Sequence, residues 1–161
     1  MKNSQTLELV AQGDREIVIT RDFDAPAKLV FRALAEPALV RRWMLGPGDY
    51  DMPVCDIDFR VGGSYKYLWK SVKDGSEMVL AGAFREIVPG KRIVRTERFE
   101  ARGWSPGDSV GTVVLTENAG KTTMQTTMLY ESKQVRDGML KSGMKEGVAM
   151  SYDRLEEVVA A

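Results

Sequence analysis

The sequence from Ser132 to Val159 reads SKQVRDGMLKSGMKEGVAMSYDRLEEVV and has the residue spacing of a single long amphipathic helix. Positions that recur every three or four residues lie on one face of a helix, and here they are mostly apolar. This stripe consists of Leu140, Met144, Val148, Ser151, Leu155 and Val159. Charged side chains fall mostly on the opposite arc, where water can solvate them: Arg136, Lys145, Glu146, Asp153, Glu156 and Glu157. We therefore expect one helix whose apolar face covers a sheet.

The chain before this helix is dominated by strand patterns. Seven segments alternate apolar and polar residues or are rich in β-branched and aromatic residues, and turn residues separate most of them. They span residues 15–23, 54–61, 64–72, 78–88, 92–99, 109–116 and 122–130. Short connections favour antiparallel neighbours, and the separation of strands from helices indicates the α+β class. We predict a curved antiparallel sheet of about seven strands wrapped around the long C-terminal helix, with a cavity between them.

Two short helices are predicted directly after the first strand. Asp24 precedes Pro26, so a capping carboxylate stands before a proline in the first turn of a helix. Pro37 begins a second short helix that stops near Trp43, before the glycine- and proline-containing loop 46–48. These helices are expected to close one end of the sheet.

Length and composition indicate one globular domain. Of 161 residues, 43% are apolar and 29% are charged, an ordinary balance for a folded chain. We expect residues 15–161 to form this domain and residues 1–14 to form a tail or a weak edge strand. The 23 basic and 23 acidic side chains cancel and are mixed along the sequence, which argues against nucleic acid as a partner.

Several absences narrow the chemistry. The chain has no histidine, which removes His-containing triads, His general bases and His-containing metal sites. Its single cysteine, Cys55, allows no intrachain disulfide, and we expect a cytoplasmic protein. No signal-peptide core is visible, and no stretch approaches the roughly 18 apolar residues of a membrane span. We expect no membrane partner, no metal and no cofactor.

The order of elements and several short motifs resemble the START-like, helix-grip superfamily. The similarity is to its bacterial branch, which resembles the C-terminal domain of the activator of the ninety-kilodalton heat-shock chaperone's ATPase. It covers nearly everything from Arg15 to Val159. The matching motifs are Asp24-Ala25-Pro26 with Val30-Phe31, Trp43 with Gly46-Pro47, Asp56-Ile57-Asp58-Phe59-Arg60 with Gly62-Gly63, Gly82-Ala83-Phe84-Arg85-Glu86-Ile87, Lys91-Arg92-Ile93-Val94, Ser142-Gly143-Met144 with Gly147, and Ser151-Tyr152-Asp153-Arg154-Leu155.

This resemblance implies a helix-grip fold with a ligand cavity between the sheet and the long helix. Members of the superfamily bind sterols, lipids, plant hormones or polyketides there, and a minority catalyse cyclisation or hydration. Relatives are often homodimers, so a homodimer is an expected assembly. The chaperone-activating role belongs to eukaryotic proteins with an additional N-terminal domain, and this chain is too short to contain one. We therefore discount that role.

Aromatic and methionine side chains are the main candidates for ligand contact. Alternation in 64–72 places three aromatic residues on one face, and other aromatic or soft side chains are expected to join them around a cavity. The predicted ligand-binding residues are Trp43, Tyr65, Tyr67, Trp69, Phe84, Glu97, Phe99, Met128 and Met144. The aromatic wall would also include Trp104. The alternative is that these residues simply form the core.

Two charged pairs offer the only candidate chemistry. Arg95 and Glu97 share the face of Ile93, so Glu97 either lines the cavity as an acid or base, or is a structural partner of Arg95. Asp56 and Asp58 are two apart on a predicted strand and suit paired acid–base work, or they form a solvent-facing edge.

We predict non-covalent binding of a small hydrophobic or amphipathic ligand. One alternative is a cyclase-like or hydrolase-like enzyme that uses the same cavity, although no catalytic constellation stands out. The other is a chaperone-linked protein-interaction module that uses the outer face of the sheet. Gly143 and Gly147 interrupt the helix stripe, where they either admit close backbone approach or widen the cavity.

Overall fold

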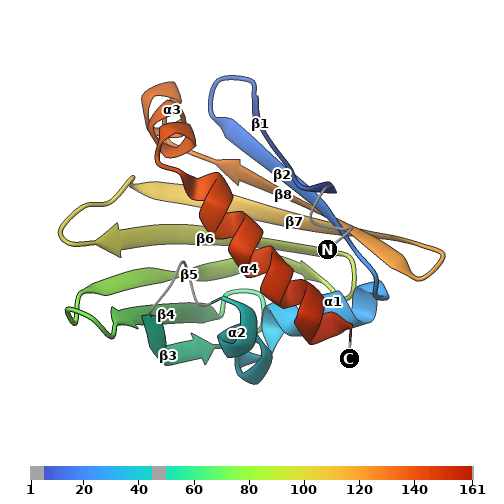
Figure 1. The fold of residues 1–161 in the computed structure, drawn as a ribbon. Helices are drawn as coiled ribbons and strands as arrows, with labels where there is room; N and C mark the ends of the chain where they lie inside the picture. Colours follow the sequence, from blue (N-terminus) through green and yellow to red (C-terminus); the bar gives the residue numbers. More distant parts are fainter. Residues whose placement is uncertain (1–5, 45–49, 161) are drawn as a thin grey trace.

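Eight antiparallel strands form one curved sheet, and the C-terminal helix crosses its concave face (Figure 1). The computed structural model describes residues 6–44 and 50–160, so the predicted loop 46–48 lies outside the described residues. The strands follow the order β1-β2-β8-β7-β6-β5-β4-β3 across the sheet. Their bounds are β1 (Glu8–Gln12), β2 (Glu16–Phe23), β3 (Tyr50–Ile57), β4 (Ser64–Ser71), β5 (Glu77–Val88), β6 (Arg92–Ala101), β7 (Asp108–Asn118) and β8 (Lys121–Leu129). The predicted α+β class and curved sheet are confirmed.

The eighth strand comes from the segment predicted as a tail or weak edge strand. β1 is mostly exposed and pairs with β2 in the register Glu8↔Thr20, so it extends the sheet at one edge. β3 also departs from its predicted bounds of 54–61, because it begins at Tyr50 and ends at Ile57. Residues 58–61, which alternation assigns to the end of that strand, lie outside it and lead into the turn at Gly62.

The predicted single C-terminal helix is wrong, because two helices occupy this segment. α3 (Lys133–Lys141) and α4 (Met144–Val159) are separated at Gly143, whose φ of 78° is left-handed. A helix cannot continue through such a residue, and glycine adopts this conformation at no steric cost. Ser132 caps the start of α3, because its hydroxyl accepts a hydrogen bond from the Val135 N–H at 3.1 Å.

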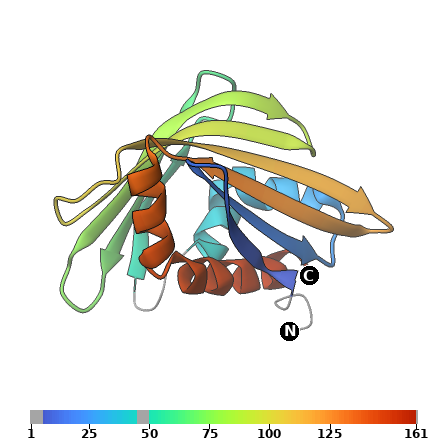
Figure 2. The ribbon, with the colours of Figure 1, turned by 90° about the horizontal axis from the view of Figure 1, so that it is seen from above.

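α3 is fixed to the β1 edge of the sheet by a buried arginine. The sequence pattern places Arg136 on the solvated arc, but its guanidinium donates to the carbonyl oxygens of Gly13 at 3.1 Å and Glu16 at 2.9 Å. Arg136 is buried, and these carbonyl groups near the β1–β2 turn accept hydrogen bonds from its guanidinium. Seen from above in Figure 2, α3 stands apart from α4 while the sheet arches over α4.

Two short helices close one end of the sheet, as predicted. They are α1 (Ala27–Ala35) and α2 (Pro37–Trp43), and the indole N–H of Trp43 donates to the Ala33 carbonyl at 2.8 Å, which joins them. The predicted Asp24 cap is wrong, since the N-cap residue of α1 is Pro26. Instead, the Ala27 N–H donates to the carboxylate of Glu117 from β7 at 2.7 Å.

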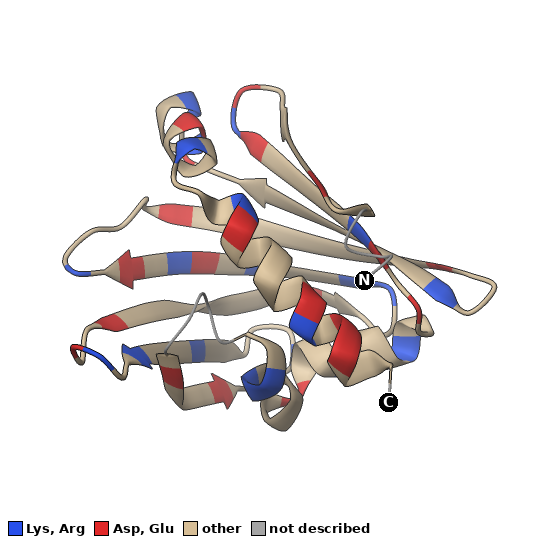
Figure 3. Cartoon of the chain, in the orientation of Figure 1, with Lys and Arg blue, Asp and Glu red and all other residues tan. Residues whose placement is uncertain are grey.

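Charged residues of both signs are interspersed along the ribbon (Figure 3). Two of them are buried between β2 and α4, contrary to the prediction that Glu156 is solvated. Arg21 and Glu156 are 0% and 3% exposed, and Arg21 also contacts Asp153. Among the described residues, no helix is long and apolar enough to span a membrane.

Candidate functional site

A cavity of about 420 Å³ lies between the concave face of the sheet and α4. Its walls come from β2 and β4 to β8 of the sheet, from α1, α2 and α3, and from the N-terminal half of α4. Apolar and aromatic side chains make up most of the lining, and cavities of this size hold small organic ligands. Open space adjoins α4 at Gly147, because a Cβ added there would meet no atom of the described chain within 4 Å.

Most of the predicted ligand-binding residues come together in this cavity. They come from four strands and two helices that are distant in sequence, and the alternation of each strand explains why they share one face. The lining includes Trp43, Tyr67, Trp69, Phe84, Glu97, Phe99, Met128 and Met144. Residues that the prediction omitted also line it, among them Met44, Met78, Leu80, Tyr130, Met139 and Tyr152.

Tyr65 is the predicted residue that lies outside the lining. Its hydroxyl donates to the Thr96 carbonyl at 2.7 Å, and its ring packs against Phe84 at 5.4 Å between centroids. Burial raises the pKa of Tyr65 well above its usual range. Tyr65 therefore supports the cavity wall from behind. Trp104, predicted to join the aromatic wall, is 53% exposed in the β6–β7 loop and is no part of the lining.

The aromatic walls are held in place by polar contacts of their own. The indole N–H of Trp69 donates to the Met44 carbonyl at 2.6 Å, which ties β4 to the end of α2. Trp43 contacts the ring of Tyr152 with centroids 6.3 Å apart, which joins α2 to α4. Both tryptophans thus have fixed orientations at the cavity surface.

Arg95 and Glu97 form an ion pair inside the cavity. This is the alternative in which Glu97 is the structural partner of Arg95. The Nε of Arg95 lies 3.1 Å from Oε2 of Glu97, and both side chains are largely buried. The Nη1 of Arg95 donates to the Tyr67 hydroxyl at 3.1 Å. Burial lowers the pKa of Arg95, but the interactions with Tyr67, Glu97 and Tyr65 together outweigh it, so the pKa of Arg95 is raised.

Gly111 of β7 makes room for this pair. It lies opposite Arg95 in the β6–β7 register, and a Cβ at this position would stand 2.7 Å from Oε2 of Glu97. Any other residue would force the carboxylate to move. Sequence reasoning missed this requirement, because the signal is a glycine whose cross-strand neighbour is known only from the register.

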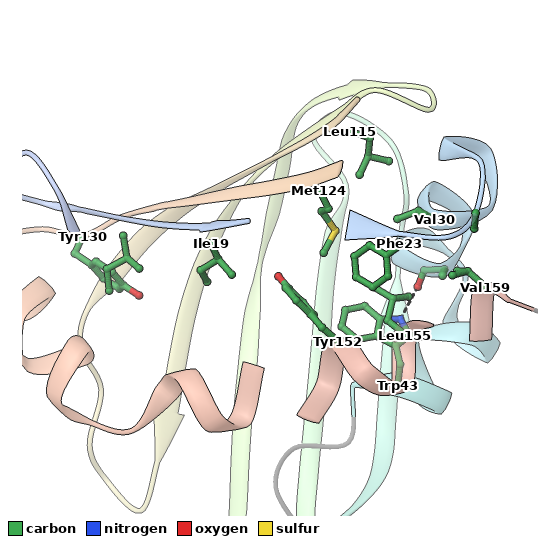
Figure 4. Packing of buried hydrophobic residues seen from close by; sticks show 13 residues of the cluster. Ile19, Phe23, Val30, Trp43, Leu115, Met124, Tyr130, Tyr152, Leu155 and Val159 are labelled. Atoms are coloured by element: carbon green, nitrogen blue, oxygen red, sulfur yellow. Dashed lines mark hydrogen bonds between the residues drawn. The ribbon is translucent and has the colours of Figure 1, made fainter. Parts of the chain in front are cut away.

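Two tyrosines that sequence reasoning did not select complete the polar part of the cavity. Figure 4 shows the hydroxyls of Tyr130 and Tyr152 pointing into the space between the sheet and α4. Tyr152 lies 3.5 Å from the Thr126 hydroxyl, whereas the Tyr130 hydroxyl has no hydrogen-bond partner among residues 6–44 and 50–160. Burial is the main reason that the pKa of each tyrosine is raised, and Glu97 raises both further. Alternation along β8 could have identified Tyr130, two residues beyond Met128.

The other candidate chemistry is absent from the cavity. Asp56 and Asp58 are exposed, and Asp58 lies beyond the end of β3, where Arg60 binds it at 3.0 Å. The solvent-facing alternative for these two carboxylates is therefore the one observed. Within the described ranges, no group of three His, Cys, Asp or Glu residues is arranged to hold a metal ion.

The sheet, the crossing helix and the cavity between them define a START-like helix-grip protein. Residues 24–160 match the model of the family described as Activator of Hsp90 ATPase homolog 1-like protein, and the chain belongs to this family. The predicted family resemblance is thereby confirmed.

Solved structures from three bacteria share the fold. A protein from Rhodobacter sphaeroides superposes with a TM-score of 0.88 at 22% identity, covering 96% of this chain and 98% of that one. A protein from Chromobacterium violaceum gives 0.78 at 26% identity, covering 91% and 99%. A protein from Mycobacterium smegmatis gives 0.78 at 20% identity, covering 96% and 98%. Curated proteins provide no match.

Proposed function

We propose that this protein binds a small hydrophobic or amphipathic molecule non-covalently between the sheet and α4. The observation that supports this most directly is the cavity of about 420 Å³ with its predominantly apolar and aromatic lining. Binding is favoured by about 25 cal/mol for each Å² of apolar cavity surface from which a ligand displaces water. Adaptable contact surface comes from six methionines in the lining: Met44, Met78, Met124, Met128, Met139 and Met144.

The ionisable groups in the cavity favour binding over catalysis. Acid–base catalysis commonly uses two carboxyl groups, but Glu97 is the single carboxylate among the described lining residues, and its Oε2 is paired with Arg95 at 3.1 Å. Arg95 is itself held between this carboxylate and the Tyr67 hydroxyl. The pair is thus arranged to orient a polar group of a ligand.

Two glycine substitutions test this proposal. Gly147 lies on the same helical face as Met144 and Ser151 and lines the cavity, whereas Gly138 in α3 is exposed. A Cβ at either position would meet no atom of the described chain within 4 Å, so both sites accept leucine without a clash of that atom. Gly147→Leu should fill the cavity, and Gly138→Leu is the matched control.

The measurement is fluorescence enhancement of N-phenyl-1-naphthylamine, together with native mass spectrometry of the protein purified from its own source. Gly147→Leu should weaken probe binding at least tenfold, and Gly138→Leu should leave it unchanged. Native spectra of the unaltered protein should show a retained small molecule. Equal probe binding by both variants, or no binding by the unaltered protein, would contradict the proposal.

A further inference from the structure

The cavity has one polar end, and its atoms indicate what kind of ligand group fits there. We propose that the ligand is an uncharged molecule bearing an alcohol or phenol hydroxyl, which accepts a hydrogen bond from Arg95 or Tyr130 and donates one to Glu97. This inference rests on the proposed function and specifies the ligand class for the same cavity.

Contacts hold the guanidinium of Arg95 in place through two of its nitrogens, and the third, Nη2, remains available to a ligand. Its Cζ lies 4.3 Å from the ring centroid of Tyr65 and 5.6 Å from that of Tyr67, so aromatic faces support it. Nε binds Glu97 and Nη1 binds the Tyr67 hydroxyl. Nη2 makes no hydrogen bond to the described part of the chain, although Arg95 lines the cavity. It is a preorganised donor for a ligand oxygen.

Glu97 provides the complementary acceptor. Oε2 is fixed by Arg95 and lies in the space that Gly111 leaves open. Oε1 has no hydrogen-bond donor among the residues that the structure describes. A carboxylate oxygen left without a donor in a largely buried site is costly, and a ligand hydroxyl would relieve that cost.

The net charge of the pair argues for a neutral ligand. Arg95 and Glu97 carry opposite charges and cancel each other 3.1 Å apart. A carboxylate or ammonium group on the ligand would bring a third charge into this buried site without a partner, at a large desolvation cost. A hydroxyl group both accepts and donates, which matches Nη2 on one side and Oε1 on the other.

Tyr130 adds a second hydroxyl on the same side of the cavity. It is 4% exposed, lines the cavity, and has no side-chain partner in the described residues. Because burial and the charge of Glu97 both raise the pKa of Tyr130, its hydroxyl stays protonated and available as a donor.

Three matched probes distinguish ligand classes: 2-naphthol, 2-methylnaphthalene and 2-naphthoate. At pH 7 the phenol is neutral and the carboxylic acid is ionised. Isothermal titration calorimetry of the full chain should show 2-naphthol binding at least tenfold more tightly than both other probes. If all three fail to bind, the proposed function fails. If they bind equally, or 2-naphthoate binds best, this inference fails while the proposed function stands.

Charge substitutions test the assignment to these residues. Glu97→Gln leaves Arg95 uncompensated and should shift the preference to 2-naphthoate at least tenfold, with little change for 2-methylnaphthalene. Glu86→Gln alters an exposed pair with Arg92 outside the cavity and should leave the ranking unchanged. Tyr130→Phe should weaken 2-naphthol severalfold and spare 2-methylnaphthalene, which provides the test if Glu97→Gln does not fold. An unchanged ranking in folded Glu97→Gln, or equal losses for both neutral probes in Tyr130→Phe, would overturn the inference.

Discussion

The guanidinium of Arg21, which no solvent reaches, lies 2.8 Å from the carboxylate of Asp153 and thereby ties β2 to α4. Glu156, one turn further along α4, lies 3.7 Å from the same guanidinium and accepts the Asp24 N–H at 3.0 Å. The C-terminal half of α4 is thus fixed by charged contacts, in addition to the apolar contacts of Leu155 and Val159.

Arg21→Met should destabilise the protein by about 3 kcal/mol, because Glu156 would then remain buried without its cationic neighbour. The matched control is Arg32→Met, which removes an exposed ion pair with Glu36 in α1 and should change the free energy of unfolding by less than about 1 kcal/mol. Urea unfolding followed by circular dichroism measures both. Similar small effects for the two variants would show that the Arg21 cluster contributes no more than a surface pair.

Gly143→Ala should lower the free energy of unfolding by about 1 kcal/mol, because alanine is strained at a left-handed φ of 78°. Gly147→Ala should raise it by up to about 1 kcal/mol, since this glycine is inside α4 and a Cβ there meets no described atom within 4 Å. The two substitutions are identical and four residues apart, so thermal unfolding of the pair isolates the effect of backbone conformation. Equal shifts in Tm would contradict the break between α3 and α4.

Gly111→Ala should destabilise the protein by about 2 kcal/mol, because its Cβ would stand 2.7 Å from Glu97 and 3.3 Å from the sulfur of Met128. The effect should shrink when Glu97 is already alanine, since the nearest obstacle is gone. A double-mutant cycle of these two positions, measured by chemical denaturation, gives the interaction energy. Strictly additive effects would mean that Gly111 does not accommodate the carboxylate.

Alkaline pH should unfold the protein as its buried tyrosines ionise. Burial is the main reason that the pKa values of Tyr65, Tyr130 and Tyr152 are raised above the usual tyrosine value of 10.0. A raised folded-state pKa means that the folded protein holds these protons more tightly than the unfolded chain. Their contribution to stability is therefore complete below about pH 10 and is lost as the pH rises further. Tyrosinate absorbance and circular dichroism, recorded in one titration, should change together for these residues. Full ionisation of all tyrosines before any loss of secondary structure would refute the prediction.

The sequence was sufficient wherever alternation alone determines which way a side chain points. Tyr67 and Trp69 on β4, and Arg95 and Glu97 on β6, were placed on a common inner face because period-two patterns survive in the folded sheet. Tyr65 follows the same alternation, yet it lies outside the lining because the cavity does not extend under the whole strand. How far a cavity extends along a strand depends on the side chains of other elements that pack over that strand. The residue pattern of one strand does not contain this information.

The remaining errors concern contacts between distant segments. Arg136 and Glu156 look solvent-facing on a helix pattern, but carbonyls of the β1–β2 turn and the guanidinium of Arg21 compensate their burial. The break at Gly143 was missed because Leu140 and Met144 keep a spacing of four across it. Only a backbone φ value separates a glycine that widens a helical face from one that ends the helix.

The left-handed residue at Gly143 makes α3 and α4 two separately anchored parts, one held by Arg136 at the β1–β2 turn and the other by Arg21 on β2. The first turns of α4 can therefore be redesigned while both anchoring contacts are kept. Met144, Gly147 and Val148 face the cavity, while the charged cluster that fixes the helix lies beyond them at Asp153 and Glu156. Libraries that vary those three positions would alter cavity size and selectivity without touching either anchor, which makes this fold a practical scaffold for small-molecule biosensors.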